Sequence, residues 1–193
     1  LINTYLCKLK QFYILIILKM KKNLLLALAL LLSVTTFAQN SSFIINETFD
    51  SAEMPEGWYF TGEGADNFKI NTTNNAGGDP NELYFKSNPI VTAGIHLVMG
   101  SADLTDVKEL GLSFKHYLSN ESPLGSTIGI ATSSDNGTTW NNAWSNTYAE
   151  ASSSGLYEIN EIISTPDMGK DNVLFCLFFE GNTSRFNKWY FDN

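Results

Sequence analysis

The sequence predicts an all-β domain, folded as a two-sheet antiparallel β-sandwich. After residue 38, short segments rich in aromatic and β-branched residues recur along the chain, and clusters of Asn, Gly, Ser and Asp separate them. None of these segments has the periodicity of an amphipathic helix. Short strands divided by turn residues at this spacing are typical of sandwiches. With 44% hydrophobic and 13% aromatic residues, the chain has enough apolar side chains for a core without disulfides.

The expected strands follow from these segments in order. They are residues 43–49, 58–61, 68–70, 83–86, 95–99, 109–117, 127–132, 143–148, 156–163, 173–179 and 189 onward. The alternation is clearest in the sixth of them, where Leu110, Leu112 and Phe114 share one parity and are expected to face the core.

His116 continues the inward parity of that strand. A metal ligand is the alternative interpretation, but the only other histidine is His96, and no Cys or His lies at ligand spacing. We therefore interpret His116 as a structural side chain.

The segment 173–179, VLFCLFF, is an unbroken apolar run of strand length. Such a run predicts a strand at the centre of a sheet, buried on both faces. Cys176 lies within it, and an apolar environment raises the pKa of a thiol and suppresses the reactive thiolate. We interpret Cys176 as a small core residue. The other cysteine, Cys7, lies near the N-terminus, so we expect no disulfide framework.

The last segment, WYFDN at 189–193, begins another strand as the sequence stops. We therefore expect the domain to be truncated at its last strand and the sequence to be a piece of a longer protein. A terminal strand of an all-β domain usually lies beside a strand from the start of the domain, which would place Asp192 near the first strand.

Residues 20–38 have the three parts of a secretory signal peptide: a basic start, a short Leu-rich stretch and a small-residue site ending at Ala38. A membrane anchor is the alternative, but the apolar stretch is well short of the roughly 20 residues that span a bilayer. We take residues 1–19 as an upstream extension and 39–193 as the exported domain. It is expected to be secreted or on the cell surface, with no membrane span in the mature chain.

Charge narrows the classes of partner. Five of the 12 Lys and Arg residues, and none of the 20 Asp and Glu residues, lie in 1–38, so residues 39–193 carry a formal charge of 7 minus 20, or −13. An acidic domain repels phosphate, which excludes nucleic acid and anionic membrane as expected partners. Divalent cations and neutral sugars remain.

The segment 133–140, SSDNGTTW, predicts a hairpin turn, in which Asp135, Asn136 and Gly137 supply the turn and Trp140 packs beneath it. It is also similar to the Asp-box of sialidase propellers, but a propeller needs several copies and this chain has one. The usual nucleophile-elbow, phosphate-loop and zinc-protease motifs are absent from the sequence, and no carboxylate pair stands out among the 20 acids. We expect no enzyme activity.

Four segments carry a resemblance to a known family. The segment 46–58, NETFDSAEMPEGW, resembles the opening of cleaved-adhesin and choice-of-anchor J domains, which are MAM-like, galactose-binding-like jelly rolls of secreted bacterial proteins. Residues 103–116, 133–140 and 179–193 resemble later parts of the same domains, in the same order. The resemblance implies a jelly-roll sandwich that serves as a non-catalytic adhesion or binding module, with a glycan or a host or cell-surface protein as its partner.

The resemblance also implies a structural calcium that joins the first strand to the last. The matching positions are Glu47, Asp50 and Asp192. Ca²⁺ takes six to eight oxygen ligands from carboxylates, carbonyls and amides, and this chain is rich in them. The alternative is that the three side chains are solvated charges at strand edges.

For a bound ligand, Trp144 and Tyr148 are the candidate residues. They lie among Asn and Ser side chains, so their rings could stack on a sugar with hydrogen-bonding groups beside them. Ordinary half-buried strand aromatics are the alternative.

Two further functional hypotheses stay open beside the binding module. The chain is the accessory domain of a secreted protease or glycosidase whose catalytic domain lies beyond residue 193, or it is a catalytic sandwich domain in its own right.

Overall fold

The chain divides into two units, Leu1–Ser42 and Phe43–Asn193. The computed structural model describes residues 20–21, 43–92, 94–119, 125–147, 155–185 and 187–192. The expected upstream extension lies outside the described residues, as does the expected signal peptide apart from Met20 and Lys21. Within the described ranges, no helix is long and apolar enough to cross a membrane.

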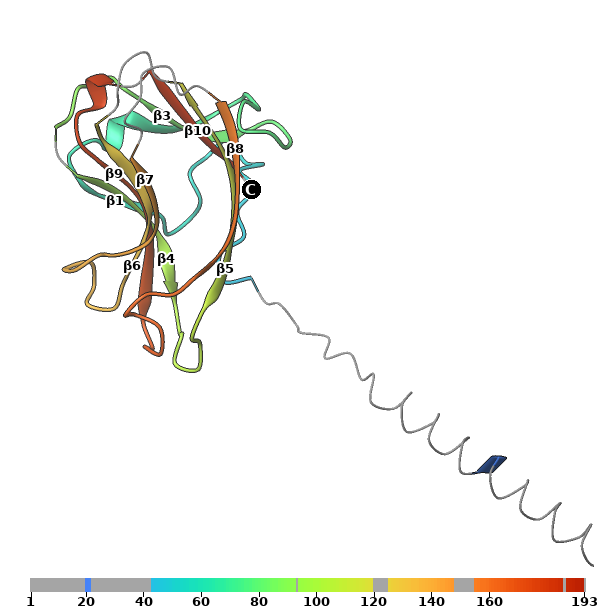
Figure 1. Cartoon of the computed structure of the whole chain (residues 1–193). Coiled ribbons are helices and arrows are strands. Elements are labelled where there is room, and N and C mark those ends of the chain that lie inside the picture. The colour runs from blue at the N-terminus through green and yellow to red at the C-terminus, as the bar shows by residue number, and fades with distance from the viewer. Residues whose placement is uncertain are drawn as a thin grey trace, which may run out of the picture. The chain divides into compact units, whose positions relative to one another are not determined.

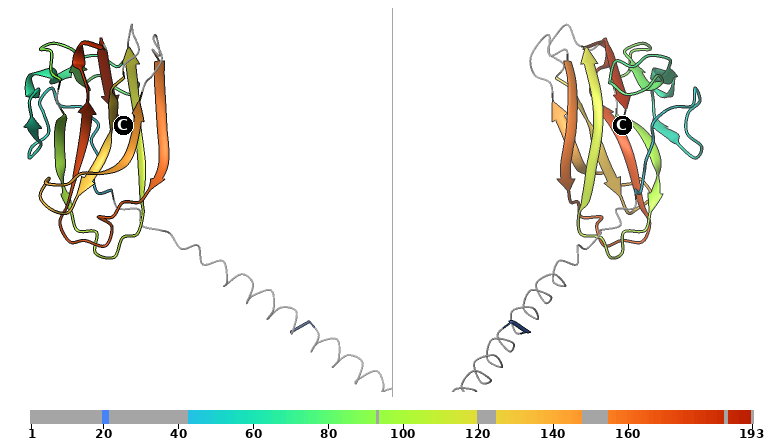
Figure 2. Two further views of the ribbon diagram at one scale, coloured as in Figure 1. Left: turned by 60° about the vertical axis from the view of Figure 1, so that its left-hand side comes forward. Right: turned by 90° about the vertical axis from the view of Figure 1, so that its right-hand side faces the viewer.

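Two antiparallel five-stranded sheets form the second unit and confirm the predicted β-sandwich (Figure 1). Sheet A contains, in spatial order, β1 (Tyr59–Gly62), β4 (Ile95–Ala102), β9 (Val173–Glu180), β6 (Thr127–Ser133) and β7 (Asn141–Thr147). Sheet B contains β2 (Phe68–Asn71), β3 (Glu82–Lys86), β10 (Lys188–Asp192), β5 (Leu110–Ser119) and β8 (Gly155–Ile163). Short 3₁₀ turns, η1 (Ala65–Asn67) and η2 (Thr183–Arg185), lie in the connections. Figure 2 shows the strands of both layers from two further sides.

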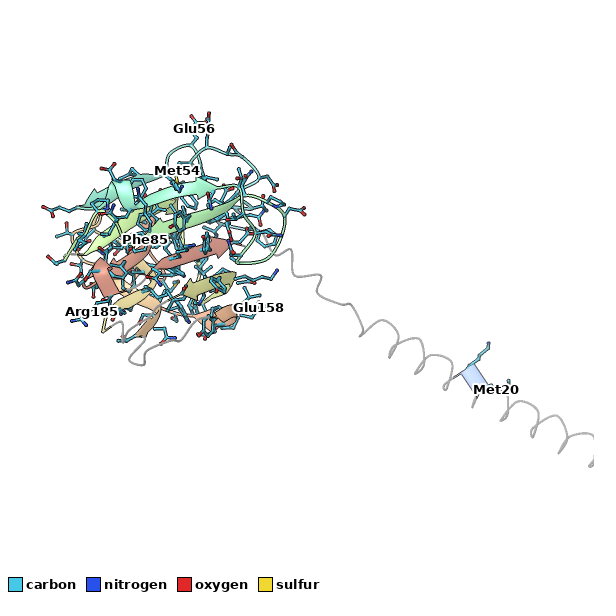
Figure 3. All side chains as sticks on the ribbon, turned by 90° about the horizontal axis from the view of Figure 1, so that it is seen from above. Met20, Met54, Glu56, Phe85, Glu158 and Arg185 are labelled. Carbon is cyan, nitrogen blue, oxygen red and sulfur yellow. The ribbon has the colours of Figure 1, made fainter. Side chains whose placement is uncertain are left out.

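The core lies between the two sheets and is rich in aromatic rings. Phe85 of β3 and Phe179 of β9 meet across the interface with ring centroids 5.2 Å apart. Phe114 of β5 and Trp144 of β7 meet edge to face at 5.1 Å. Figure 3 shows Phe85 within the packed side chains, with Glu56 on a loop at the edge of the domain. Burial of rings of this size is the main stabilising contribution to such a sandwich.

Strand β9 occupies the centre of sheet A, between β4 and β6, as its apolar sequence predicts. Cys176 of this strand is buried between its neighbours Val98 and Ala131. Burial raises the pKa of the Cys176 thiol to about 12. The interpretation of Cys176 as an inert core residue is therefore confirmed.

The opening segment differs from the prediction. Residues 43–50 form no strand, and Phe43 is 77% exposed. Phe49 is buried with a φ of 53°, which interrupts the extended backbone. Its ring contacts Trp58 at 5.8 Å and Phe191 of β10 at 6.4 Å. Strand β10 pairs with β3 and β5, and the opening segment contacts it through the ring of Phe49.

The hairpin between β6 and β7 has the predicted turn. Asn136 and Gly137 have φ angles of 58° and 80°. The Asp135 carboxylate accepts hydrogen bonds from the Ser133 hydroxyl and the Thr139 amide, both at 2.8 Å. These donors hold the pKa of Asp135 below its usual value. The motif is thus a folding device at the end of sheet A.

The buried carboxylate of Asp167 ties the turn after β8 to this hairpin. It accepts hydrogen bonds from the Thr132 hydroxyl at 2.6 Å, the Ser134 amide at 3.0 Å and the Asn141 amide group at 3.0 Å. Burial opposes its ionisation, but the hydrogen bonds outweigh burial and lower the pKa of Asp167. Asp167 therefore serves the fold.

Candidate functional site

A row of three tyrosines crosses the outer face of sheet B. Tyr190 of β10 lies directly opposite Tyr84 of β3 on one side and Tyr117 of β5 on the other. In each strand the flanking residues face the core, so the tyrosines point away from it. Tyr190, in the middle of the row, is nevertheless only 6% exposed, whereas Tyr84 and Tyr117 are half-buried. The strand register alone brings together these residues, which are far apart in the sequence.

The three rings contact one another along the row. The rings of Tyr84 and Tyr190 stack with centroids 4.9 Å apart at 23°. Those of Tyr117 and Tyr190 lie 6.2 Å apart and meet at 53°. Lys69 of β2 extends the row, with its ammonium 5.2 Å from the centroid of the Tyr84 ring. The row therefore has a cation at one end and a tilted pair of rings at the other.

A groove of about 490 Å³ lies over the tilted pair of rings. Each residue that lines the groove carries a polar group, which is a phenol, an amide, a hydroxyl or an ammonium. These residues come from β5, β10 and two connections: Asn75, Tyr117, Ser119, Asn187, Lys188 and Tyr190. A groove with aromatic rings and convergent hydrogen-bonding groups fits a polar ligand with apolar faces. We call it the tyrosine groove.

Glu82 positions one rim of the tyrosine groove. This buried carboxylate accepts hydrogen bonds from the backbone amides of Asn75 at 2.9 Å and Ala76 at 2.7 Å. It also accepts one from the Asn75 side chain at 2.9 Å and one from the Thr73 hydroxyl. These donors fold the β2–β3 connection over Glu82 and place Asn75 at the groove. Because its oxygens are engaged here, Glu82 is a structural carboxylate.

The opposite rim comes from the start of β10. The Asn187 amide donates to the carbonyl of Ser119 at 3.0 Å, which joins this rim to the end of β5. Upstream, the amide of Thr183 donates to the carbonyl of Val91 at 2.9 Å, and the Thr183 hydroxyl accepts from the Val91 amide at 2.8 Å. Asn187 and Lys188 are thereby held beside the tyrosines.

The groove is uncharged at its floor. Burial raises the pKa of Tyr84, and burial together with the nearby Tyr84, Glu82 and Tyr117 raises the pKa of Tyr190. Both phenols keep their protons at neutral pH, so each can donate and accept a hydrogen bond. Tyr190 therefore offers a neutral hydroxyl at the floor of the groove, and Lys188 is the charged residue of its lining.

The structure places the expected ligand residues elsewhere. Trp144 is 9% exposed and packs in the core, 5.1 Å from Phe114 and 5.8 Å from His116. This burial supports the packing interpretation of Trp144, because the ring belongs to the aromatic core between the sheets. Tyr148 lies outside the described residues.

Two of the expected calcium ligands, Glu47 and Asp50, lie in the opening segment, and the third, Asp192, lies at the end of β10. The contact between Phe49 and Phe191 brings the segment that carries Glu47 and Asp50 to the end of β10. One oxygen of Glu47 accepts the Phe49 amide at 2.7 Å, and one oxygen of Asp50 accepts the Thr48 hydroxyl at 2.8 Å.

Asp192 is 1% exposed and lies opposite Lys115 in the β5–β10 register. Across the ranges that the structure describes, no group of three or more His, Cys, Asp and Glu side chains could hold a metal ion. A calcium here would therefore need backbone carbonyl or amide oxygens beside the carboxylates.

His116 faces the core, as its parity predicts. It is fully buried, stacks on Tyr157 at 5.0 Å, and its Nδ1 accepts a hydrogen bond from the Trp189 indole at 3.2 Å. Nδ1 as an acceptor places the proton of the neutral ring on Nε2. Burial lowers the pKa of His116 to about 4. It is a neutral core residue at physiological pH.

Comparison with known proteins finds the fold and no sequence relative. No family model matches the chain, and no curated protein matches it. Among solved structures, the K1 cleaved adhesin domain of Lys-gingipain from Porphyromonas gingivalis W83 is similar, with a TM-score of 0.53, 16% identity, and coverage of 76% of this chain and 92% of that one. The K3 cleaved adhesin domain of the same protein has a TM-score of 0.50, 16% identity and coverage of 78% and 96%.

The chain has the jelly-roll fold of cleaved adhesin domains.

A structure of carbohydrate-binding modules of the β-sandwich superfamily is also similar, with a TM-score of 0.52, 14% identity, and coverage of 75% of this chain and 58% of that one. The cleaved-adhesin fold confirms the architecture that the segments 46–58, 103–116, 133–140 and 179–193 imply. At these identities the likeness concerns the fold and assigns no ligand.

Sequence reasoning missed the tyrosine groove on this cleaved-adhesin fold. A signal was present, because Tyr84, Tyr117 and Tyr190 each stand between two apolar or inward-facing residues: LYF, HYL and WYF. Parity places each ring on the polar face of its strand. Their meeting in one row depends on the register between β3, β10 and β5, which the sequence does not display.

Proposed function

We propose that this chain is a non-catalytic binding module of a larger secreted or cell-surface bacterial protein, and that it binds a carbohydrate in the tyrosine groove. The observation that carries the proposal is the row Tyr84–Tyr190–Tyr117 with amide and hydroxyl groups at its rims. Support also comes from the fold, which the chain shares with adhesin domains and with carbohydrate-binding modules.

The chemistry of the groove suits sugars. Carbohydrate rings present C–H groups on their faces and hydroxyls at their edges. Aromatic rings can pack against the faces, while Asn75, Asn187 and Ser119 can exchange hydrogen bonds with the hydroxyls. The groove lies on the outer face of sheet B beside the β2–β3 connection, and we expect it to accommodate part of a longer polysaccharide.

The alternative is an accessory domain of a secreted hydrolase, which would bind the substrate of a catalytic domain located elsewhere in the protein. The same groove would then serve targeting. The gene sequence beyond residue 193 separates the two, because a protease or glycosidase domain there would favour the accessory role. Hydrolysis of a glycan or ester by the chain itself, lost in a single carboxylate variant, would overturn the non-catalytic proposal.

Replacement of Tyr117 by alanine is expected to weaken polysaccharide binding about 10- to 100-fold, because it removes an aromatic contact of the size that contributes about 1.5–3 kcal/mol when buried. Affinity electrophoresis against a panel of immobilised polysaccharides, followed by calorimetry on the best of them, measures this change.

The matched control is Tyr59→Ala. Tyr59 lies on β1 of the other sheet and is 46% exposed, so its loss removes a surface tyrosine without touching the groove. Equal affinities for the native protein and the Tyr117 variant would contradict the groove as the binding site.

A structural calcium held by Glu47, Asp50 and Asp192 stays a prediction. It is supported by the burial of Asp192 and by the Phe49–Phe191 contact, which brings the opening segment to β10. Such an ion would screen carboxylates in a domain of strongly negative charge. At 100 times its dissociation constant it would stabilise the fold by about 2.7 kcal/mol. Chelation is therefore expected to lower the melting temperature by about 5–10 °C.

Thermal melting with excess chelator, and again after calcium is restored, tests this prediction. In Asp192→Asn the response to chelator should shrink, whereas it should persist in Asp106→Asn, which changes an exposed aspartate in a different connection. An unchanged melting temperature in the native protein would remove all three residues as ligands.

A further inference from the structure

The basic residues of this acidic domain are unevenly placed. Residues 39–193 contain seven Lys and Arg residues. Four of them lie on the outward parity of sheet B, the face that carries the tyrosine groove: Lys69, Lys86, Lys115 and Lys188. A domain with a formal charge of −13 thus presents most of its positive charge on one sheet face.

Two of these lysines lie beside each other, and one of them, Lys188, lines the groove. Lys188 of β10 stands directly opposite Lys86 of β3, one outward position along from the paired Tyr190 and Tyr84. Like charges in directly opposed cross-strand positions destabilise a sheet. Within the described part of the chain, neither ammonium is paired with a carboxylate. Such a pair is explained if a bound anion neutralises it.

The acidic residues on the same face of sheet B do not neutralise Lys86 and Lys188. Glu82 and Asp192 are both buried, and they lie on the other side of the tyrosine row from Lys86 and Lys188. Glu158 is opposite Lys115, also on that side. Outward positions along a strand are about 7 Å apart, so the two lysines are about 13 Å from this carboxylate row. At that distance neither lysine can form an ion pair with these carboxylates.

We infer that the tyrosine groove binds an acidic polysaccharide, with a sugar ring over Tyr117 and a carboxylate or sulfate of the chain at Lys188 and its cross-strand neighbour Lys86. This inference rests on the proposed carbohydrate-binding function and narrows its ligand. The overall negative charge argues for neutral sugars, but the local charge at the groove argues for an anion. Salt screens the exposed carboxylates elsewhere on the domain, so the charges that a ligand contacts in the groove decide.

Matched pairs of probes isolate the acid group. Polygalacturonate is compared with its methyl ester, and dextran sulfate with dextran, by calorimetry at two salt concentrations. The first pair reports on carboxylates and the second on sulfates. The native protein is expected to bind at least one acidic member at least about tenfold more tightly than its neutral counterpart, with affinity that falls as salt rises.

The double variant Lys86→Gln/Lys188→Gln is expected to lose that preference while it keeps residual binding to the neutral probe. The control is Lys108→Gln/Lys170→Gln, which removes the same charge from two exposed lysines in other connections. It should bind as the native protein does. The melting temperature without ligand should be unchanged or higher in Lys86→Gln/Lys188→Gln, since a like-charge pair is relieved.

Four other results would overturn the inference, and each would point to a different explanation. Equal binding of acidic and neutral probes that depends on Tyr117 but not on the lysines would refute the acidic ligand and leave the proposed function standing. Equal losses in both double variants would indicate non-specific charge attraction. Tighter binding of polyglutamate than of any polysaccharide would assign the lysines to an acidic peptide. Failure to bind any polysaccharide would refute the inference and the proposed function together.

Discussion

Replacement of Trp189 by alanine is expected to lower the free energy of unfolding by about 3–5 kcal/mol, the range for large aromatic side chains deleted from cores. Trp189 is 1% exposed, and its ring meets those of Phe85 and Phe191 edge to face, both at 6.3 Å. Its indole also donates the hydrogen bond to Nδ1 of His116. The substitution would therefore leave a cavity and an unsatisfied buried acceptor at once.

Urea denaturation measures this change, and two further variants separate its causes. Trp189→Phe keeps an aromatic ring and loses the hydrogen bond, so a smaller loss of about 1–3 kcal/mol is expected. Trp140→Ala removes a partly buried ring that stacks on His96 at 5.3 Å outside the inter-sheet core, and it should cost less than Trp189→Ala. Equal losses for the two alanine variants would contradict the placement of the core between the sheets.

The second large effect is a loss of stability in mild acid that comes from His116. Its pKa is about 4 in the folded protein and 6.5 when unperturbed, because burial disfavours the imidazolium. Between these two values the unfolded chain binds a proton that the folded chain does not. The free energy of unfolding therefore falls as the pH falls from about 6.5 to about 4, by up to about 1.4 kcal/mol per pH unit.

Between pH 7 and pH 5 this linkage amounts to about 2 kcal/mol. Urea denaturation at several pH values in that window measures the slope, and His116→Asn should remove most of it. His96→Gln is the control, because His96 is only partly buried and Glu180 opposes the effect of burial on its pKa. If His116→Asn retained the native slope, His116 would not be the group responsible. Asp167, whose pKa is lowered, contributes its own loss only at lower pH.

The strand pattern was readable because it depends on local alternation. Ten of the predicted segments correspond to β1–β10, and the hairpin turn at Asp135, Asn136 and Gly137 has the expected geometry. The segment 43–49 failed for a local reason that alternation does not reveal. Its apolar residues have different environments, since Phe49 is buried with positive φ while Phe43 is exposed.

The candidate binding site was harder to predict from the sequence, because its residues come from several strands. Trp144 was predicted to bind a ligand because its neighbours in the sequence are polar, yet its parity on β7 turns it into the core. The three tyrosines of the row were not predicted as ligand residues, because their neighbours are mostly apolar. Strand parity nevertheless places Tyr84, Tyr117 and Tyr190 on the outer side of sheet B. Polarity of the flanking sequence was therefore a poor guide to which face of the sheet a side chain lies on, and strand parity was the better one.

By itself, the sequence determined the all-β class, the order of the strands, the hairpin turn, and the burial of Cys176 and His116. Each of these follows from side chains that are close together along the chain. Only the tertiary structure decided that β10 lies between β3 and β5, and with it the tyrosine row and the opposed pair Lys86 and Lys188. The physical reason is that cross-strand register is set by packing of the whole core, which no single segment encodes.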